Sequence, residues 1–198
     1  MIKYIEWDEE KLQQWFKDKF RKRGLDIREY IFLTKFIREI EPEIVIDVGT
    51  FLGASGYILG TSSPKLKKLY ALEHHHGSTY SGPYKGLVKT EDYGKYLPEY
   101  AIFKTIGYEI DLEPILKEHE GGDVFIFFDS GKNPMRIFHQ VQMCYQYKIR
   151  YVAFHDTKTP QVRRGIKRVK ELGLYRIHSE CLDAPDEGKK GVTILELC

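Results

Sequence analysis

The chain has 198 residues, of which 42% are hydrophobic and 30% are charged, and this composition suits one α/β domain with a sizeable core. Its formal net charge of +2 is too small to indicate a nucleic-acid partner. The three cysteines are widely spaced, which argues against a disulfide framework and favours a reducing compartment. The N-terminus lacks the hydrophobic region of a secretory signal, and the longest apolar runs are far shorter than a membrane span. We therefore expect a soluble cytoplasmic protein.

Apolar residues recur at helical spacing over residues 8–22 and 27–40, before Pro42. We assign these two helices to an N-terminal helical cap, residues 1–42, and expect residues 43–198 to form one compact unit. Beyond Pro42, strand-like runs alternate with helix-like runs, which predicts right-handed crossovers and a mostly parallel sheet. The predicted strands are 44–48, 68–73, 100–105, 123–128, 150–154, 174–178 and 191–197. The predicted helices are 54–61, 85–97, 110–118, 134–147 and 160–172.

The last two predicted strands differ from the others in how they are joined. Residues 179–190 are polar and show no helical pattern. We therefore expect a loop that joins two antiparallel neighbours at the end of the sheet.

The most informative segment is Ile44–Ser55, where an apolar strand containing Asp47 runs into a turn with Gly49 and Gly53. A strand, a glycine turn and a helix start in this order indicate a nucleotide-type cofactor at the carboxyl end of a central strand. Phe51 stands where a pyrophosphate would require a second glycine. The carboxylate of Asp47 would repel a phosphate and would suit a ligand with a positively charged amino group. The turn therefore disfavours a dinucleotide.

Other polar side chains follow the later strands, at the edge of the sheet where ligands bind in open α/β folds. Glu73 ends the second strand, where an acid can accept hydrogen bonds from ribose hydroxyls; the alternative is a solvated acid at a strand end. Asp129 and Lys132 follow the fourth strand, and His155-Asp156 follow the fifth. We expect these groups to gather at one edge.

Four segments together resemble the class I S-adenosylmethionine-dependent methyltransferases: Asp47–Ser55, Glu73, Val124–Asp129 and Phe154–Thr157. More narrowly, they resemble the small-molecule O-methyltransferases, both catechol-type and bacterial sugar- or antibiotic-modifying. The resemblance covers roughly residues 40–198. It implies a Rossmann-like, doubly wound, seven-stranded sheet in the order 3-2-1-4-5-7-6 with an antiparallel last strand. It also implies methyl transfer from S-adenosylmethionine to a hydroxyl of a sugar, a phenol or a natural-product-like molecule.

The resemblance also implies roles for single residues in cofactor binding. Asp47 would hold the cofactor ammonium, Ser55 would reach its carboxylate with help from the helix N-terminus, and Glu73 would take the ribose. Tyr108 would lie beside the adenine. The full cofactor-binding set is Asp47, Gly49, Thr50, Gly53, Ser55, Glu73, His74, Tyr108 and Asp129.

Members of the catechol-type subgroup hold a divalent cation after the fourth and fifth strands, and the matching positions here are Asp129, His155 and Asp156. Carboxylate oxygens suit Mg²⁺, whereas imidazole prefers zinc, iron or nickel, and His155 stands where that subgroup usually has a carboxylate. The metal and its identity thus stay open. His155 is alternatively a general base or an acceptor-orienting group, and Asp156 is alternatively a helix cap.

Lys132 matches a lysine that takes the acceptor proton in the catechol-type enzymes, and its alternative is an exposed turn residue. The predicted catalytic set is Lys132, His155 and Asp129.

Three further patterns allow two interpretations each. The tract His74-His75-His76 flanks the adenosine rather than binding a metal, because alternate side chains of an extended segment point in opposite directions. The basic residues at 163–170 lie opposite an apolar stripe of Val162, Ile166, Val169 and Leu172, which favours a solvated helix face over a nucleic-acid patch. The tyrosines of residues 77–98 form either a lid over the acceptor or ordinary packing.

The leading hypothesis is an O-methyltransferase with a small-molecule acceptor as partner. It leaves a homo-oligomer open and disfavours membrane and nucleic-acid partners. The alternatives are an NAD-type oxidoreductase and a non-catalytic nucleoside-binding domain of the same fold.

Overall fold

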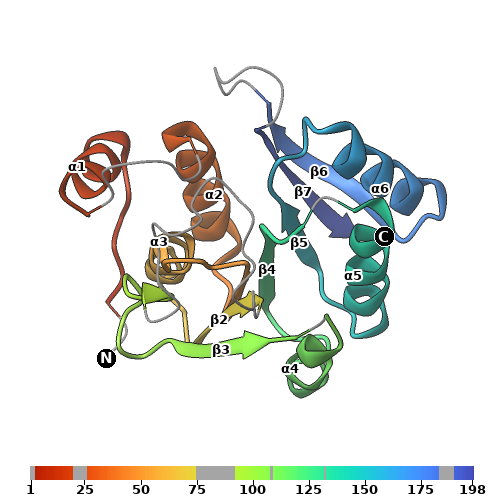
Figure 1. The fold of residues 1–198 in the computed structure, drawn as a ribbon, viewed down its shortest axis with the longest axis horizontal. Helices are drawn as coiled ribbons and strands as arrows, with labels where there is room; N and C mark the ends of the chain where they lie inside the picture. The colour runs from red at the N-terminus through yellow and green to blue at the C-terminus, as the bar shows by residue number, and fades with distance from the viewer. Residues whose placement is uncertain (1–2, 20–25, 75–91, 108, 132, 183–189) are drawn as a thin grey trace.

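The computed structural model describes residues 3–19, 26–74, 92–107, 109–131, 133–182 and 190–198. Its centre is a seven-stranded sheet in the order β3-β2-β1-β4-β5-β7-β6 (Figure 1). The strands are β1 (Ile44–Val48), β2 (Lys68–His74), β3 (Ile102–Ile106), β4 (Val124–Phe128), β5 (Tyr151–Phe154), β6 (Tyr175–Cys181) and β7 (Val192–Leu197). β7 runs antiparallel to β5 and β6, and the other neighbouring strands are parallel. The predicted sheet order and its antiparallel last strand are confirmed.

Helices cover both faces of this sheet (Figure 1). They are α1 (Glu9–Lys19), α2 (Ile27–Ile40), α3 (Ala54–Ser62), α4 (Glu113–Glu118), α5 (Pro134–Gln146) and α6 (Pro160–Glu171), with a 3-10 turn η2 (Glu109–Leu112) before α4. The packing of β4 explains why this strand is apolar throughout. Phe125 and Phe127 pack with α1, α2 and α3, whereas Val124, Ile126 and Phe128 pack with α4, α5 and α6. A strand buried on both faces favours apolar residues at every position.

Three sequence predictions differ from the structure. The described part of the predicted helix 85–97 forms turns, because the backbone N–H groups of Gly94 and Tyr96 donate to the carbonyls of Phe51 and Leu52 at 2.8 and 2.9 Å. Residues 179–181, predicted as loop, continue β6 instead, since they pair with β7. Leu172 lies beyond α6 and is 54% exposed, so it does not belong to the apolar stripe. Residues 20–22, 85–91 and 183–189 of the predictions lie outside the described residues.

Within the part of the chain that the structure describes, no helix combines the length and the apolar character needed to cross a membrane.

Candidate active site

The glycine turn after β1 brings the backbone of β1 against the start of the loop after β4. Gly49 has a φ of 95°, and a Cβ at this position would lie 2.7 Å from the carbonyl oxygen of Asp129. Gly53 has a φ of 90°, and a Cβ there would lie 2.7 Å from the Leu97 side chain. Both positions combine a left-handed backbone with a close approach that a larger side chain would block. The turn is therefore fixed by its two glycines, and Leu97 packs directly on the second.

Asp47 is fully buried at the base of this turn. The Ser55 hydroxyl donates a 2.7 Å hydrogen bond to Oδ2 of Asp47, so it is turned toward Asp47 rather than outward. Among the described residues, neither Oδ1 of Asp47 nor the Thr50 hydroxyl has a hydrogen-bond partner of good geometry. Burial raises the pKa of Asp47 to about 7, although the nearby hydroxyls of Ser55 and Thr50 lower it. A buried carboxylate oxygen without a partner is costly, and a ligand ammonium group would satisfy it.

Glu73 and His74 lie at the carboxyl end of β2, next to the turn. The Glu73 carboxylate is 3% exposed and accepts hydrogen bonds from the backbone N–H groups of Phe51 and His74. Burial raises its pKa to about 7 against the effect of these two donors. His74 contacts the guanidinium of Arg136, from the first turn of α5, with 3.2 Å between Nη2 and Nδ1. Arg136 was not predicted, since no motif marks it.

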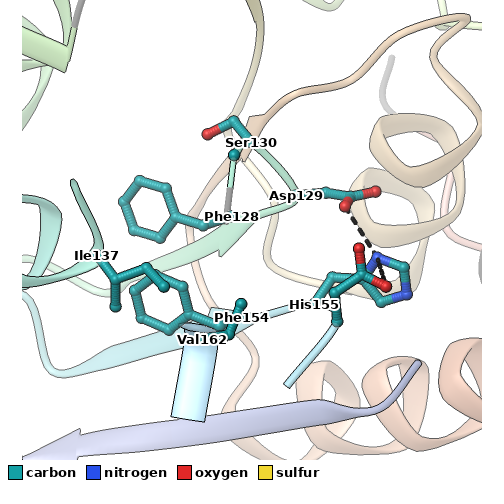
Figure 2. Close-up of a pocket in the computed structure, with 9 residues that line it drawn as sticks. Phe128, Asp129, Ser130, Ile137, Phe154, His155 and Val162 are labelled. Atoms are coloured by element: carbon teal, nitrogen blue, oxygen red, sulfur yellow. Dashed lines mark hydrogen bonds and ion pairs between the residues drawn. The ribbon is translucent and has the colours of Figure 1, made fainter. Parts of the chain in front are cut away.

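Asp129, His155 and Asp156 converge beyond the ends of β4 and β5. Figure 2 shows the His155 ring beside the carboxylate of Asp129. Nδ1 of His155 lies 2.8 Å from Oδ1 of Asp129 and 3.9 Å from Oδ1 of Asp156. One potential ligand atom from each residue lies within 4.8 Å of the others. Asp156 has a φ of 56°, a left-handed conformation that non-glycine residues adopt mainly at functional sites and turns. The predicted gathering of these three groups is observed.

The same three residues border a small pocket with a cavity volume of about 20 Å³. Its apolar side chains lie on one side and the polar cluster on the other (Figure 2). The lining is completed by Phe128, Ser130, Gly131, Ile137, Phe154 and Val162. The polar groups therefore converge at the surface end of a small pocket whose apolar side chains belong to the hydrophobic core.

A third carboxylate lies near His155, on the side of Nε2. Glu29 of α2 is fully buried, and its Oε2 lies 3.4 Å from Nε2 of His155. Burial lowers the pKa of His155, but Asp129, Glu29 and Asp156 outweigh that effect and raise the pKa well above its ordinary value. Sequence reasoning missed Glu29. The only available signal was a capping box with Asp26, which marks the start of α2 and not a site.

The remaining predicted site residues fall into two groups. Lys132, Tyr108, His75 and His76 lie outside the described residues, as do Tyr80 and Tyr84. The helix-cap alternative for Asp156 is not observed, because the N-cap of α6 is Thr159. The basic side chains of α6 are exposed and its apolar residues are buried, as expected for a solvated helix face.

No family model matches this sequence, and no curated protein matches it. Solved structures do match the fold. A candidate O-methyltransferase from Klebsiella pneumoniae has a TM-score of 0.65 at 15% identity, covering 98% of this chain and 91% of the other. An O-methyltransferase from Bacillus cereus in complex with S-adenosylhomocysteine has a TM-score of 0.64 at 14% identity, with coverage of 98% and 93%. The O-methyltransferase TomG from Streptomyces achromogenes, in complex with S-adenosylmethionine, has a TM-score of 0.62 at 16% identity, with coverage of 98% and 91%. The chain therefore has the Rossmann-like fold of these methyltransferases.

Proposed function

We propose that the protein is a methyltransferase that moves a methyl group from S-adenosylmethionine to a hydroxyl of a small molecule. The observation that carries the proposal is the buried carboxylate of Asp47, whose Oδ1 lacks a hydrogen-bond partner among the described residues at a glycine turn. S-adenosylmethionine supplies an activated methyl group on its sulfonium and carries an ammonium group that suits this oxygen. The fold, shared with O-methyltransferases bound to this cofactor or its product, supports the same conclusion.

The residues around the turn fit the parts of this cofactor. Asp47 and the Thr50 hydroxyl offer polar atoms to an ammonium group, and Ser55 holds the Asp47 carboxylate in place. Glu73 offers carboxylate oxygens for ribose hydroxyls beside the turn. His74, the next residue, would flank the adenosine. Gly49, Gly53 and Asp129 shape the backbone there, and the role of Tyr108 stays a prediction.

The acceptor is proposed to bind in the pocket bordered by Asp129, His155 and Asp156. The protein's part in such a transfer is to align the acceptor oxygen and to remove its proton. The polar cluster would meet the acceptor hydroxyl at this edge of the sheet. A divalent cation held by Asp129, Asp156 and His155 would lower the pKa of that hydroxyl. Lys132 or His155 would serve as the base.

The raised pKa of His155 bears on its role. With no cation bound, the raised pKa favours the charged ring, which holds Asp129 through the 2.8 Å contact at Nδ1. It accepts a proton only after giving one up. We therefore favour a role in orienting Asp129 over a general-base role for His155, and a cation would have to displace the ring proton before His155 could bind it.

The cofactor site predicts a specific pH dependence. In the folded protein the pKa of Asp47 is raised to about 7, so below that pH the carboxyl is mostly neutral and must lose its proton before pairing with an ammonium group. Affinity for S-adenosylmethionine should therefore fall about tenfold for each pH unit below 7 and level off above it. Isothermal titration between pH 5.5 and 8 would measure this slope.

Two variants distinguish the contribution of Asp47 to this pH dependence from that of Glu73. Asp47→Asn should bind more weakly and lose most of the slope, whereas Glu73→Gln should keep it, although the pKa of Glu73 is also about 7. An affinity that does not change with pH in the unmodified protein would contradict the role given to Asp47.

A further inference from the structure

A second and larger groove lies between α6 and the edge strand β6, which pack side by side (Figure 1). One wall comes from α6, and the other comes from β6 and β7. The groove has a cavity volume of about 460 Å³, which lies in the usual range for a small-molecule site. None of its lining residues borders the pocket beside Asp129. The groove is therefore a separate candidate site.

The α6 wall of the groove combines a basic stripe with an apolar surface. Arg163, Lys167 and Lys170 are spaced four and three residues apart, so they lie along one face of the helix. Ile166 lies on the same face and is 5% exposed. Nε of Arg163 donates a 3.3 Å hydrogen bond to the backbone carbonyl of Thr157, which fixes this end of the stripe.

The chain compensates the positive charge of this wall only in part. Lys167 pairs with Glu171 at 3.6 Å, and both side chains are well exposed, so the pair is weak. Among the residues that the structure describes, no carboxylate lies within ion-pair distance of Arg163 or Lys170. The groove can therefore accept an anionic group from a ligand.

The opposite wall carries an acid that an irregularity in β6 turns into the groove. The pairing of β6 with β7 shifts by one residue between Ile177 and Ser179, as at a β-bulge. Residues three apart in a regular strand face opposite sides of the sheet, yet Ile177 and Glu180 both line the groove. Re-aiming a side chain is a common effect of a bulge. The hydroxyl of the buried Thr193 then donates a 2.7 Å hydrogen bond to Oε1 of Glu180.

We propose that this groove binds a small organic anion that has an apolar frame between its charged group and a hydrogen-bond donor. The anionic group would meet Lys167 and Lys170, and the frame would lie on Ile166 and Ile177. The donor would meet the carboxylate of Glu180 on the opposite wall. A bare anion would gain only exposed charge contacts, which are weak in water. The site is independent of the proposed methyl transfer, because that reaction uses none of these residues.

The test is calorimetric titration, without cofactor, with an aminonaphthalene sulfonate that carries its two groups on opposite rings. Three further probes each lack one part: naphthalene sulfonate lacks the donor, naphthylamine lacks the anion, and inorganic sulfate lacks the frame. We expect saturable binding of the complete probe with one molecule per chain, and weaker binding of the other three. No saturable binding of the complete probe, or equally tight binding of sulfate, would overturn the proposal.

Charge-removing variants of α6 show where the probe binds. Lys167→Met and Lys170→Met keep the length of the side chain, and each should lower the affinity for the complete probe about 2–5-fold. Arg164→Met is the matched control, since Arg164 is an exposed basic residue of the same helix that does not line the groove. It should leave the affinity unchanged. An equal loss in Arg164→Met and Lys170→Met would overturn the proposal, because the probe would then respond only to net charge.

Glu180→Gln tests the orientation of the bound anion. The amide oxygen can still accept the hydrogen bond from Thr193, but the carboxylate charge is gone. The variant should lose most of the preference for the complete probe over naphthalene sulfonate. A preference that survives in full would overturn the contact of the donor with Glu180. These titrations contain no S-adenosylmethionine, so failure of that cofactor to bind would count against the proposed function alone.

Discussion

Asp129→Ala should lower the rate of methyl transfer about 10²–10⁴-fold, the range associated with losing a group that handles the acceptor proton. The carboxylate lies 2.8 Å from Nδ1 of His155 and borders the acceptor pocket. Its removal takes away a proposed cation ligand and the partner that orients the histidine. The side chain is 33% exposed, so the variant should fold, but loss of the partner of the nearly buried His155 ring should lower the free energy of unfolding by about 1–3 kcal/mol.

The rate would be measured as S-adenosylhomocysteine release with catechol, simple phenols and sugars as acceptors, with and without Mg²⁺. Asp123→Ala is the matched control, since Asp123 is an exposed acid just before the other end of β4. It should leave the rate unchanged. Full activity in Asp129→Ala would contradict the roles given to this edge of the sheet.

Gly49→Ala should lower the free energy of unfolding by about 2–4 kcal/mol, from a left-handed backbone conformation and a steric clash together. The added Cβ would lie 2.7 Å from the carbonyl oxygen and 2.8 Å from the carbonyl carbon of Asp129. These are backbone atoms, so relief requires moving the loop after β4. Because that loop carries Asp129, we also expect weaker cofactor binding and slower transfer in whatever fraction folds.

Gly121→Ala is the control that measures the cost of the left-handed backbone conformation without a steric clash. Gly121 has a φ of 66°, and nothing lies within 4 Å of the position of its Cβ. The substitution should cost about 1–2 kcal/mol from conformation alone. Urea unfolding followed by circular dichroism would compare the two variants. An equal cost at both positions would mean that the close approach of Gly49 to Asp129 does not constrain the turn.

Most of the sheet was predictable because its strands carry a clear physical signal. β4 is an apolar run of strand length, β1 is apolar except for Asp47, and both are buried on both faces. The convergence of Asp129 with His155 was predictable for a related reason. β4 and β5 are adjacent and parallel, with Phe128 opposite Phe154, so the residues that follow them must meet. The complete strand order came from the family resemblance rather than from periodicity.

The errors occurred where tertiary contacts decide the local structure. The helix predicted over 85–97 failed in its described part because Gly94 and Tyr96 bond to the glycine turn instead of to their own segment. Glu29 could not be recognised as a site residue. Its local pattern indicates a helix cap, and its contact with His155 depends on how α2 packs over the edge of the sheet. No pattern of spacing along the chain encodes that packing.

The measurement that tests the proposed function most directly is calorimetric titration of the unmodified protein with S-adenosylmethionine, S-adenosylhomocysteine and NAD, each with and without Mg²⁺. The geometry of Asp47 and the glycine turn predicts saturable binding of both sulfur nucleosides at neutral pH. It also predicts no binding of NAD, since Phe51 stands where a pyrophosphate needs glycine. Binding of NAD, or failure of both sulfur nucleosides to bind, would contradict the assignment of this turn as a methyl-donor site.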